Sequence, residues 1–287
     1  MRLIRIVLIL FAVFFSVITL FAVLIYGFAM DNNATRAFNK TFPVLPAAMV
    51  SGKIVRIAEI EDRQRMYEQA VSMTSAGAPI NGATERESIL DSLIEQKIVW
   101  DMLAKRKILI NSEELDDYYR HLAASFQTGR INEIFGVNEK DFKKNIVLSD
   151  LAEKKLHASL YKQDNGSKEY QRVLKIKKLV DEGLSFVEAA QSYSEDEESK
   201  YIGGDIGFKT EDELGPWLGP SARALAPSTT SEVIVSPEGY HILRLASLDS
   251  ETVPRKLQIQ QILIRGFDFE EYLEKQREKY RIYLFGR

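Results

Sequence analysis

Histidine and cysteine supply much of the acid–base, nucleophilic and metal chemistry of proteins, and this 287-residue chain has few of them. It contains no cysteine, which excludes disulfides, thiol catalysis and thiolate metal sites. Its three histidines are His121, His157 and His241, and none belongs to an H-E-x-x-H zinc motif. His241 stands in GYHILRL, a pattern typical of a strand that leaves a tight turn. A lone histidine in a strand is either a satisfied core residue or part of a site, and spacing alone leaves both open.

Two further stretches carry polar groups of interest. Asp196 stands among Glu195, Glu197 and Glu198, which is equally typical of a solvated acidic loop. If these carboxylates approach one another in space, we expect each to raise the pKa of the others. Gln261 interrupts the apolar run LQIQQILI, and its amide can donate and accept hydrogen bonds but cannot titrate.

The elements that must position these residues lie behind a break at KQDNGS, residues 162–167. Helical patterns over 168–183 and 186–194 come first, and the glycine-rich GGDIGF follows at 203–208. Two strands are predicted at 231–236 and 239–247, joined by the turn PEG, and a third at 257–264. A short helix and a terminal strand at 281–285 complete the chain. Helices mixed with antiparallel strands predict an α+β domain over 167–287.

Residues 46–166 are predicted to form a mainly helical domain. Asn111 and Glu114 have the spacing of a helix cap, and a long helix is expected from about Glu139 to Tyr161. The polar, proline-containing stretch 31–45 is typical of a linker.

The N-terminal segment 1–30 carries the strongest physical signal in the chain. Its central stretch, Ile6–Phe28, contains no charged side chain. As a helix this stretch would be about 34 Å long, enough for the roughly 30 Å core of a bilayer. Arg2 and Arg5 would keep the N-terminus in the cytoplasm. A cleaved signal peptide, with small residues at Gly27 and Ala29, is the alternative, and either would place the remaining chain outside the cytoplasm.

The bulk composition is that of a globular protein, with 45% hydrophobic and 28% charged residues. A net charge of −3 lacks the positive excess that is typical of nucleic-acid-binding proteins. No motif indicates a peptidase, a cofactor or a metal site, so we expect neither cofactor nor metal.

The run from Leu184 to Leu245 resembles the parvulin family of peptidyl-prolyl isomerases. The matching segments, in the family's order, are LSFVEAAQSYSED, GGDIGF, LGPWL and VIVSPEGYHILRL. Upstream, AAMVSGKIV and the helices over 93–120 resemble the chaperone domain of the SurA/PrsA class of extracytoplasmic foldases. The resemblance implies a membrane anchor (1–30), a linker (31–45), a SurA N-like helical domain (46–166) and a PpiC-type parvulin domain (167–287).

The resemblance also implies a proline-binding slot. Leu214 and Leu218 fall on its two apolar positions, and Trp217 is a candidate for an additional wall. Ordinary core leucines are the alternative. Gly219–Pro220 departs from the family pattern, and we expect this pair to break the helix that presents the two leucines.

A polar cluster at the floor of the slot is implied as well. His241 falls on the family's second histidine, Ser236 on its hydroxyl position, and Asp196 on a position for Asp or Cys. The strand that carries the family's first histidine is missing before residue 168. His157 does not supply this histidine, because it lies in the wrong place and in a stretch expected to be helical. Gln261 fits that slot in the strand at 257–264. We therefore predict a permuted module whose first strand has moved to the C-terminus and pairs with 241–246.

Rotation about an X–Pro bond must overcome about 18–20 kcal/mol and needs neither nucleophile nor metal. The resemblance thus implies a membrane-anchored peptidyl-prolyl isomerase and chaperone that acts on unfolded or proline-containing polypeptides outside the cytoplasm. Because Gln261 replaces a histidine, a catalytically weak holdase is the alternative. A structural adaptor with one fixed partner is the third class.

Overall fold

The computed structural model describes residues 16–27, 33–41, 44–74, 82–125, 131–163 and 166–285. The chain forms two compact units that interleave along the sequence. The first comprises residues 1–98, 133–137 and 274–287, and the second comprises 99–132 and 138–273. Within the described ranges, no helix is both long enough and apolar enough to cross a bilayer. Nearly half of the predicted membrane segment Ile6–Phe28, namely residues 6–15 and 28, lies outside these ranges.

The first unit contains a three-stranded antiparallel sheet that pairs the first strand of the described chain with the last. The strand order is β2 (Lys53–Arg56), β1 (Pro46–Val50), β7 (Ile282–Leu284). Near this terminal strand, Arg277 forms ion pairs with Asp91 and Glu95 at 2.6 and 3.4 Å. The helices with residues in this unit are η1 (Val23–Gly27), α2 (Asn33–Thr41), α3 (Ile57–Thr74), α4 (Gly82–Lys105), α6 (Ile131–Phe135) and α12 (Phe269–Arg277).

The second unit begins with helices that lead to the sheet domain. Asn111 Oδ1 accepts a hydrogen bond from the Glu114 backbone N–H at 2.8 Å, which caps the next helix as predicted. The predicted long helix is confirmed over residues 139–163, with a π-helical turn inside it. The elements of this part are α5 (Ser112–Ser125), α7 (Glu139–Phe142), η2 (Lys143–Val147) and α8 (Leu148–Gln163).

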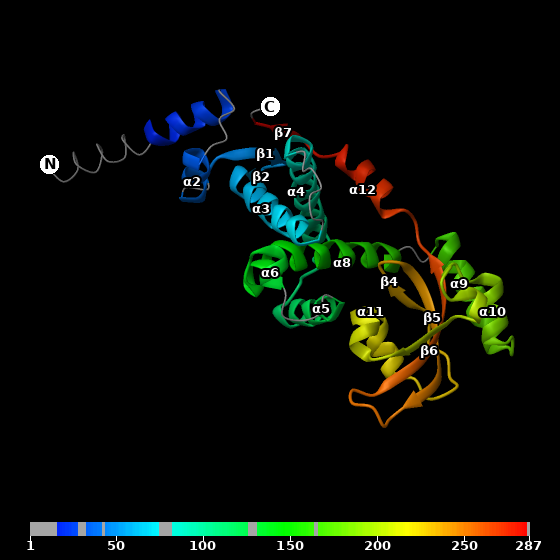
Figure 1. Cartoon of the computed structure of the whole chain (residues 1–287). Coiled ribbons are helices and arrows are strands. Elements are labelled where there is room, and N and C mark those ends of the chain that lie inside the picture. The colour runs from blue at the N-terminus through cyan, green and yellow to red at the C-terminus, as the bar shows by residue number, and fades with distance from the viewer. Residues whose placement is uncertain are drawn as a thin grey trace, which may run out of the picture. The chain divides into compact units, whose positions relative to one another are not determined.

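A four-stranded antiparallel sheet forms the centre of the second unit (Figure 1). Its order is β3 (Asp205–Lys209), β6 (Lys256–Arg265), β5 (Gly239–Asp249), β4 (Ile234–Ser236). The predicted pairing of 257–264 with 241–246 is confirmed, because Tyr240 lies opposite Ile264 and Leu243 lies opposite Gln261. The expected α+β class is confirmed as well, with a helical N-terminal region before an antiparallel-sheet domain.

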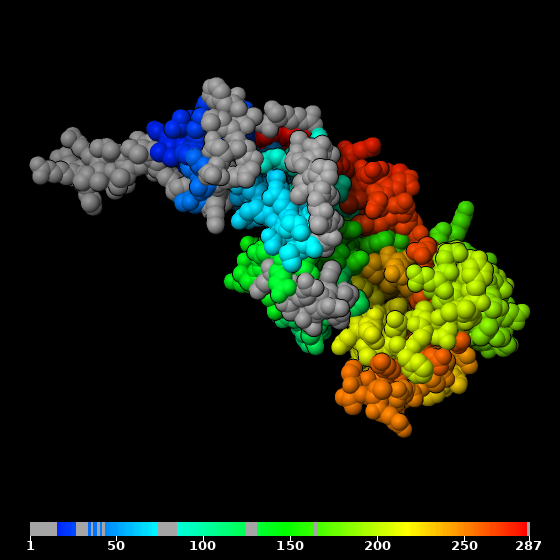
Figure 2. Space-filling view, viewed as in Figure 1, coloured from blue at the N-terminus to red at the C-terminus, as the bar shows by residue number. Residues whose placement is uncertain are grey.

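The two faces of this sheet are covered by different helices. Successive side chains of a strand point to opposite faces. Tyr240 and Ile242 of β5 therefore pack with α9 (Lys168–Asp181) and α10 (Phe186–Tyr193) on one face. Leu243 and Leu245 pack with α11 (Glu211–Ala224) on the other (Figure 1). The tip of the β5–β6 hairpin, residues 250–256, is exposed and is drawn in orange in Figure 2.

Helix α11 begins with a capping box and then bends. The Thr210 hydroxyl accepts a hydrogen bond from the Glu213 backbone N–H, and the Glu213 carboxylate accepts one from the Thr210 backbone N–H. The break expected at Gly219–Pro220 is wrong, because the helix continues through that pair to Ala224. The break lies four residues earlier, at Gly215, whose φ of 70° interrupts the helix just before Pro216.

Candidate functional site

His241 lies at the centre of the candidate site, on the sheet face that α11 covers. Its side chain is fully buried, at 0% exposure. Its Nε2 shares a hydrogen bond of 2.7 Å with the hydroxyl of Ser236, which lies on the neighbouring strand β4. The structure thus brings together the histidine and the hydroxyl that the sequence suggested.

Gln261 and Asp196 continue this group of polar side chains. Gln261 lies one strand away from His241 and diagonal to it, because His241 faces Leu263 across the β5–β6 pair. The Gln261 amide donates from Nε2 to Asp196 Oδ2 at 2.8 Å. Ser199 donates its hydroxyl hydrogen to the same carboxylate oxygen. The four candidate polar residues therefore lie in one group, in the order Asp196, Gln261, His241, Ser236.

The electrostatics of the group keep His241 neutral near pH 7. Burial lowers its pKa to about 4, against smaller raising contributions from Gln261 and Asp196. The Gln261 amide is near enough to raise this pKa, yet among the described residues Nδ1 of His241 has no partner at ordinary hydrogen-bond geometry.

Asp196 stays ionised, for a reason that the sequence did not indicate. Burial alone would raise its pKa. Hydrogen bonds from Ser199, from Gln261 and from the Glu198 backbone outweigh burial and, with the charge of Arg265, lower that pKa below its ordinary value. No neighbouring carboxylate contributes to this shift, so the condition for the rise considered from the sequence is not met at Asp196.

The glycine-rich turn holds β6 at a close approach. The Gln261 backbone N–H donates to the Gly204 carbonyl at 2.7 Å. A Cβ atom on Gly204 would lie 2.4 Å from the Gln261 carbonyl oxygen, so a side chain cannot be added there without movement. Asp205 has a structural role: its carboxylate joins the turn to β6 by accepting hydrogen bonds from the Gly207 N–H and from Gln258 Nε2 at 2.8 and 3.0 Å.

The apolar candidates lie on the same face of the sheet as His241. Leu214 is buried in a cluster with Leu243 and Leu245 of β5, and Leu218 packs against that cluster. Trp217 contacts a different element: its ring packs edge-on against Tyr118 of α5, with ring centroids 5.7 Å apart.

His157 lies outside the site, as the sequence suggested. It sits on helix α8, and its Nε2 shares a hydrogen bond of 2.6 Å with the hydroxyl of Tyr161. Its ring stacks on Phe269, with centroids 4.3 Å apart. Burial lowers the pKa of His157 to about 4.

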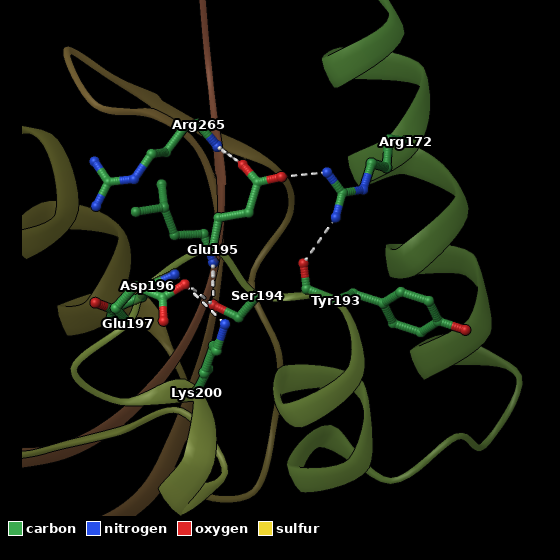
Figure 3. Close-up of polar contacts among 9 residues, drawn as sticks. Arg172, Tyr193, Ser194, Glu195, Asp196, Glu197, Lys200 and Arg265 are labelled. Atoms are coloured by element: carbon green, nitrogen blue, oxygen red, sulfur yellow. Dashed lines mark hydrogen bonds and ion pairs between the residues drawn. The ribbon is translucent and has the colours of Figure 1, made fainter.

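Sequence reasoning missed several residues that hold the site in place. Ser194 and Ser199 flank Asp196 and are both buried. Arg172 of α9 contacts the acidic loop, which comprises residues 194–199 directly after α10 (Figure 3). The pattern S-x-D-x-x-S was a local signal for the two serines, because serine and aspartate form hydrogen-bonded turns at such spacings. No local signal pointed to Arg172, which lies 23 residues before its partner Glu195.

Fold and site together define a class of protein. The second unit is an α+β module whose antiparallel sheet carries a neutral buried histidine, a hydrogen-bonded carboxylate and an apolar cluster on one face. Residues 154–247 match the family model described as Rotamase: PPIC-type PPIASE domain. Over these residues the chain therefore contains a PPIC-type parvulin rotamase domain.

Curated relatives agree with this assignment. Foldase protein PrsA 2 of Bacillus anthracis is 36% identical over 111 residues, which cover 38% of this chain and 35% of that protein. Chaperone SurA of Nitrosospira multiformis is 30% identical over 116 residues, covering 38% of this chain and 26% of that protein. The chain is thus distantly homologous to PrsA foldases and SurA chaperones, but spans about a third or less of the length of these relatives.

A solved structure is also similar. The crystal structure of peptidylprolyl isomerase PrsA from Bacillus anthracis matches at 20% identity, over 67% of this chain and 86% of that one. The TM-score of the pair is 0.25, a value that gives no support to a shared overall shape.

Proposed function

We propose that this protein is an isomerase of X–Pro bonds that also assists the folding of exported polypeptides. The observation that carries this proposal is the group Asp196, Gln261, His241 and Ser236, which shares one sheet face with Leu214 and Leu218. In this proposal the two leucines hold the proline ring, and the polar group forms the floor beneath the twisting amide.

The chemistry asked of these residues is modest. Twisting the X–Pro amide removes its resonance, so a site accelerates rotation by favouring the twisted amide over the planar one. A neutral His241 can donate or accept a hydrogen bond without carrying charge into a buried apolar surrounding. The ionised Asp196 orients the Gln261 amide, and no bond to carbon forms or breaks.

A non-catalytic holdase is the second candidate, and Gln261 favours it. The likeness to parvulins places a histidine where this chain has Gln261, so the polar group contains one imidazole ring, that of His241, instead of two. If both rings are needed, the same apolar face would bind unfolded segments without isomerising them.

Cis–trans isomerisation of a proline-containing peptide by the full-length protein in detergent separates the two functions. We expect a rate above the uncatalysed one, a large loss in His241→Ala, and a gain in Gln261→His. If no catalysis is seen while aggregation of an unfolded client is still suppressed, the holdase is the function. Recovery of one tight partner, with neither activity, would indicate an adaptor.

We further propose that residues 1–30 form a membrane anchor, 31–45 a linker, 46–166 a chaperone-like domain and 167–287 the parvulin-like domain. The uncharged Ile6–Phe28 segment after Arg2 and Arg5 supports an anchor with a cytoplasmic N-terminus and an extracytoplasmic bulk. In intact cells, or in spheroplasts if an outer membrane is present, an added protease should digest the region after residue 31. Protection of that region would exclude this topology.

The proposal includes a permuted order of strands. The family match ends at Ser247, whereas the central strand β6 begins only at Lys256. Strand β6 occupies the position between β3 and β5. In this proposal it replaces the opening strand of the parvulin sheet.

A further inference from the structure

The acidic loop after α10 continues the hydrogen-bonded edge of β6 beyond the end of β3. Strand β3 pairs with residues 257–260 of β6. Past that point the Leu263 N–H donates to the Ser194 hydroxyl at 3.1 Å, and the Glu195 N–H donates to the Leu263 carbonyl at 2.8 Å. The Arg265 N–H donates to Glu195 Oε2 at 2.8 Å. The loop that carries Asp196 is therefore joined to the strand that carries Gln261.

Glu195 connects this loop to a third element, helix α9. Its other carboxylate oxygen, Oε1, pairs with Nη1 of Arg172 (Figure 3). Arg172 Nη2 donates to the Tyr193 carbonyl at 3.2 Å, so the guanidinium contacts the loop at two points. A planar guanidinium can make two such contacts at once, which a lysine ammonium does less well.

We propose that the Arg172–Glu195 pair is a positioning clamp that holds the acidic loop on β6 and thereby places Asp196 against Gln261. Its effect on catalysis rests on the proposed isomerase function. Glu195 and Arg172 are positioning residues, because their side chains contact the loop and the strand end rather than the apolar face where a proline would bind. The charge of Arg265, which the same carboxylate anchors through the backbone, helps to keep Asp196 ionised.

The neighbouring carboxylate Glu197 provides a matched control. Glu197 pairs with Lys200, three residues further along the same loop, and its side chain is 70% exposed. Glu195 is 32% exposed and has partners on two other elements. Replacing either residue by glutamine changes the net charge by the same amount, but only one of these changes disturbs the contact with β6.

The test compares Glu195→Gln with Glu197→Gln in the full-length protein. Hydrogen exchange at the Arg265 amide should become about fivefold or more faster in Glu195→Gln and should be unchanged in Glu197→Gln. The pKa of Asp196, followed through its carboxyl carbon by NMR, should rise in Glu195→Gln alone. Glu195→Ala, which removes both acceptor oxygens, should increase exchange further.

A double-variant comparison tests whether the pair acts as a unit. Arg172→Gln should give the same faster exchange as Glu195→Gln, and combining the two changes should add little. In the isomerase assay, Glu195→Gln should lower kcat several-fold with little change in KM, because the two apolar pocket candidates are untouched.

The outcomes separate this proposal from the proposed function. Equal exchange rates and equal Asp196 pKa values in Glu195→Gln and Glu197→Gln would overturn the clamp, whatever the isomerase activity. A wild-type protein without isomerase activity would remove the proposed function. If exchange at Arg265 still increased in Glu195→Gln alone, the clamp would stand as a structural device of the loop.

Discussion

A methyl group at Gly204 is the most specific test of the arrangement around Gln261. Gly204 has φ of +80°, a conformation that side chains disfavour. An alanine Cβ would also lie 2.4 Å from the Gln261 carbonyl oxygen and 3.1 Å from the Ala190 side chain. Because a backbone oxygen cannot rotate away as a flexible side chain can, the turn and β6 must separate.

Gly207 supplies the control that divides the effect into two parts. Its φ is +77°, nearly the same, but no atom lies within 4 Å of a Cβ placed there. Gly207→Ala should therefore lower the free energy of unfolding by about 1–2 kcal/mol through backbone conformation alone. Gly204→Ala should add roughly 1–3 kcal/mol for the steric overlap.

The assay is urea unfolding of the full-length protein in a Trp100→Phe background, so that fluorescence reports Trp217 in the second unit. The Asp196–Gln261 hydrogen bond can be followed in parallel through the NMR signals of the Gln261 side-chain amide. We expect those signals to shift in Gly204→Ala and to stay in place in Gly207→Ala. If the two variants had the same free energy of unfolding within experimental error and neither moved the amide signals, the close approach of turn and strand would be refuted.

Three further predictions concern stability, each checked by urea unfolding. Burial lowers the pKa of His241 from the ordinary 6.5 to about 4, so the unfolded chain binds a proton first on acidification. This contribution of about 3 kcal/mol is present above pH 6.5 and lost as the pH falls from about 6.5 to about 4, and His241→Gln should remove that part of the pH dependence. A Cβ on Gly266 would lie 2.0 Å from Cζ of Tyr161, so Gly266→Ala should cost roughly 1–3 kcal/mol, partly restored by adding Tyr161→Leu. Thr210→Ala removes the capping box of α11 and should cost about 1 kcal/mol, whereas the isosteric Thr210→Val should cost no less if the hydroxyl matters.

The strands around His241 could be predicted because their information is local. GYHILRL and LQIQQILI are short, rich in strand-forming residues and follow or precede turn signals, so their patterns favour strands, and a short connection favours a hairpin between them. The partner of the terminal strand could not be predicted in this way. Strand β7 pairs with β1, which lies near the opposite end of the chain, and nothing in the composition of either strand specifies the other.

The bend in α11 shows a different limit of sequence reasoning. The chain contains two similar pairs, Gly215–Pro216 and Gly219–Pro220, and either could end a helix. The structure breaks at the first pair, because Gly215 takes a positive φ and Pro216 then begins the second helical segment, where its missing N–H is tolerated. Gly219 instead lies close against the Glu211 carbonyl, where a Cβ would be 2.6 Å from the oxygen. Packing between the two segments decides the position of the bend, and a linear pattern does not contain that information.

The placement of β6 at the end of the chain has a consequence for how the site assembles. His241 and Gln261 lie on adjacent strands of one hairpin, so their approach requires closing only a short loop. With the partner strand at the start of the module, the same pairing would close a loop several times longer, and the entropy of closure rises with the logarithm of loop length. The histidine and the glutamine are therefore brought together by local structure. The acidic loop must dock from a distance of some 65 residues, which is why its attachment through Arg172, Glu195 and Arg265 matters for the completed group.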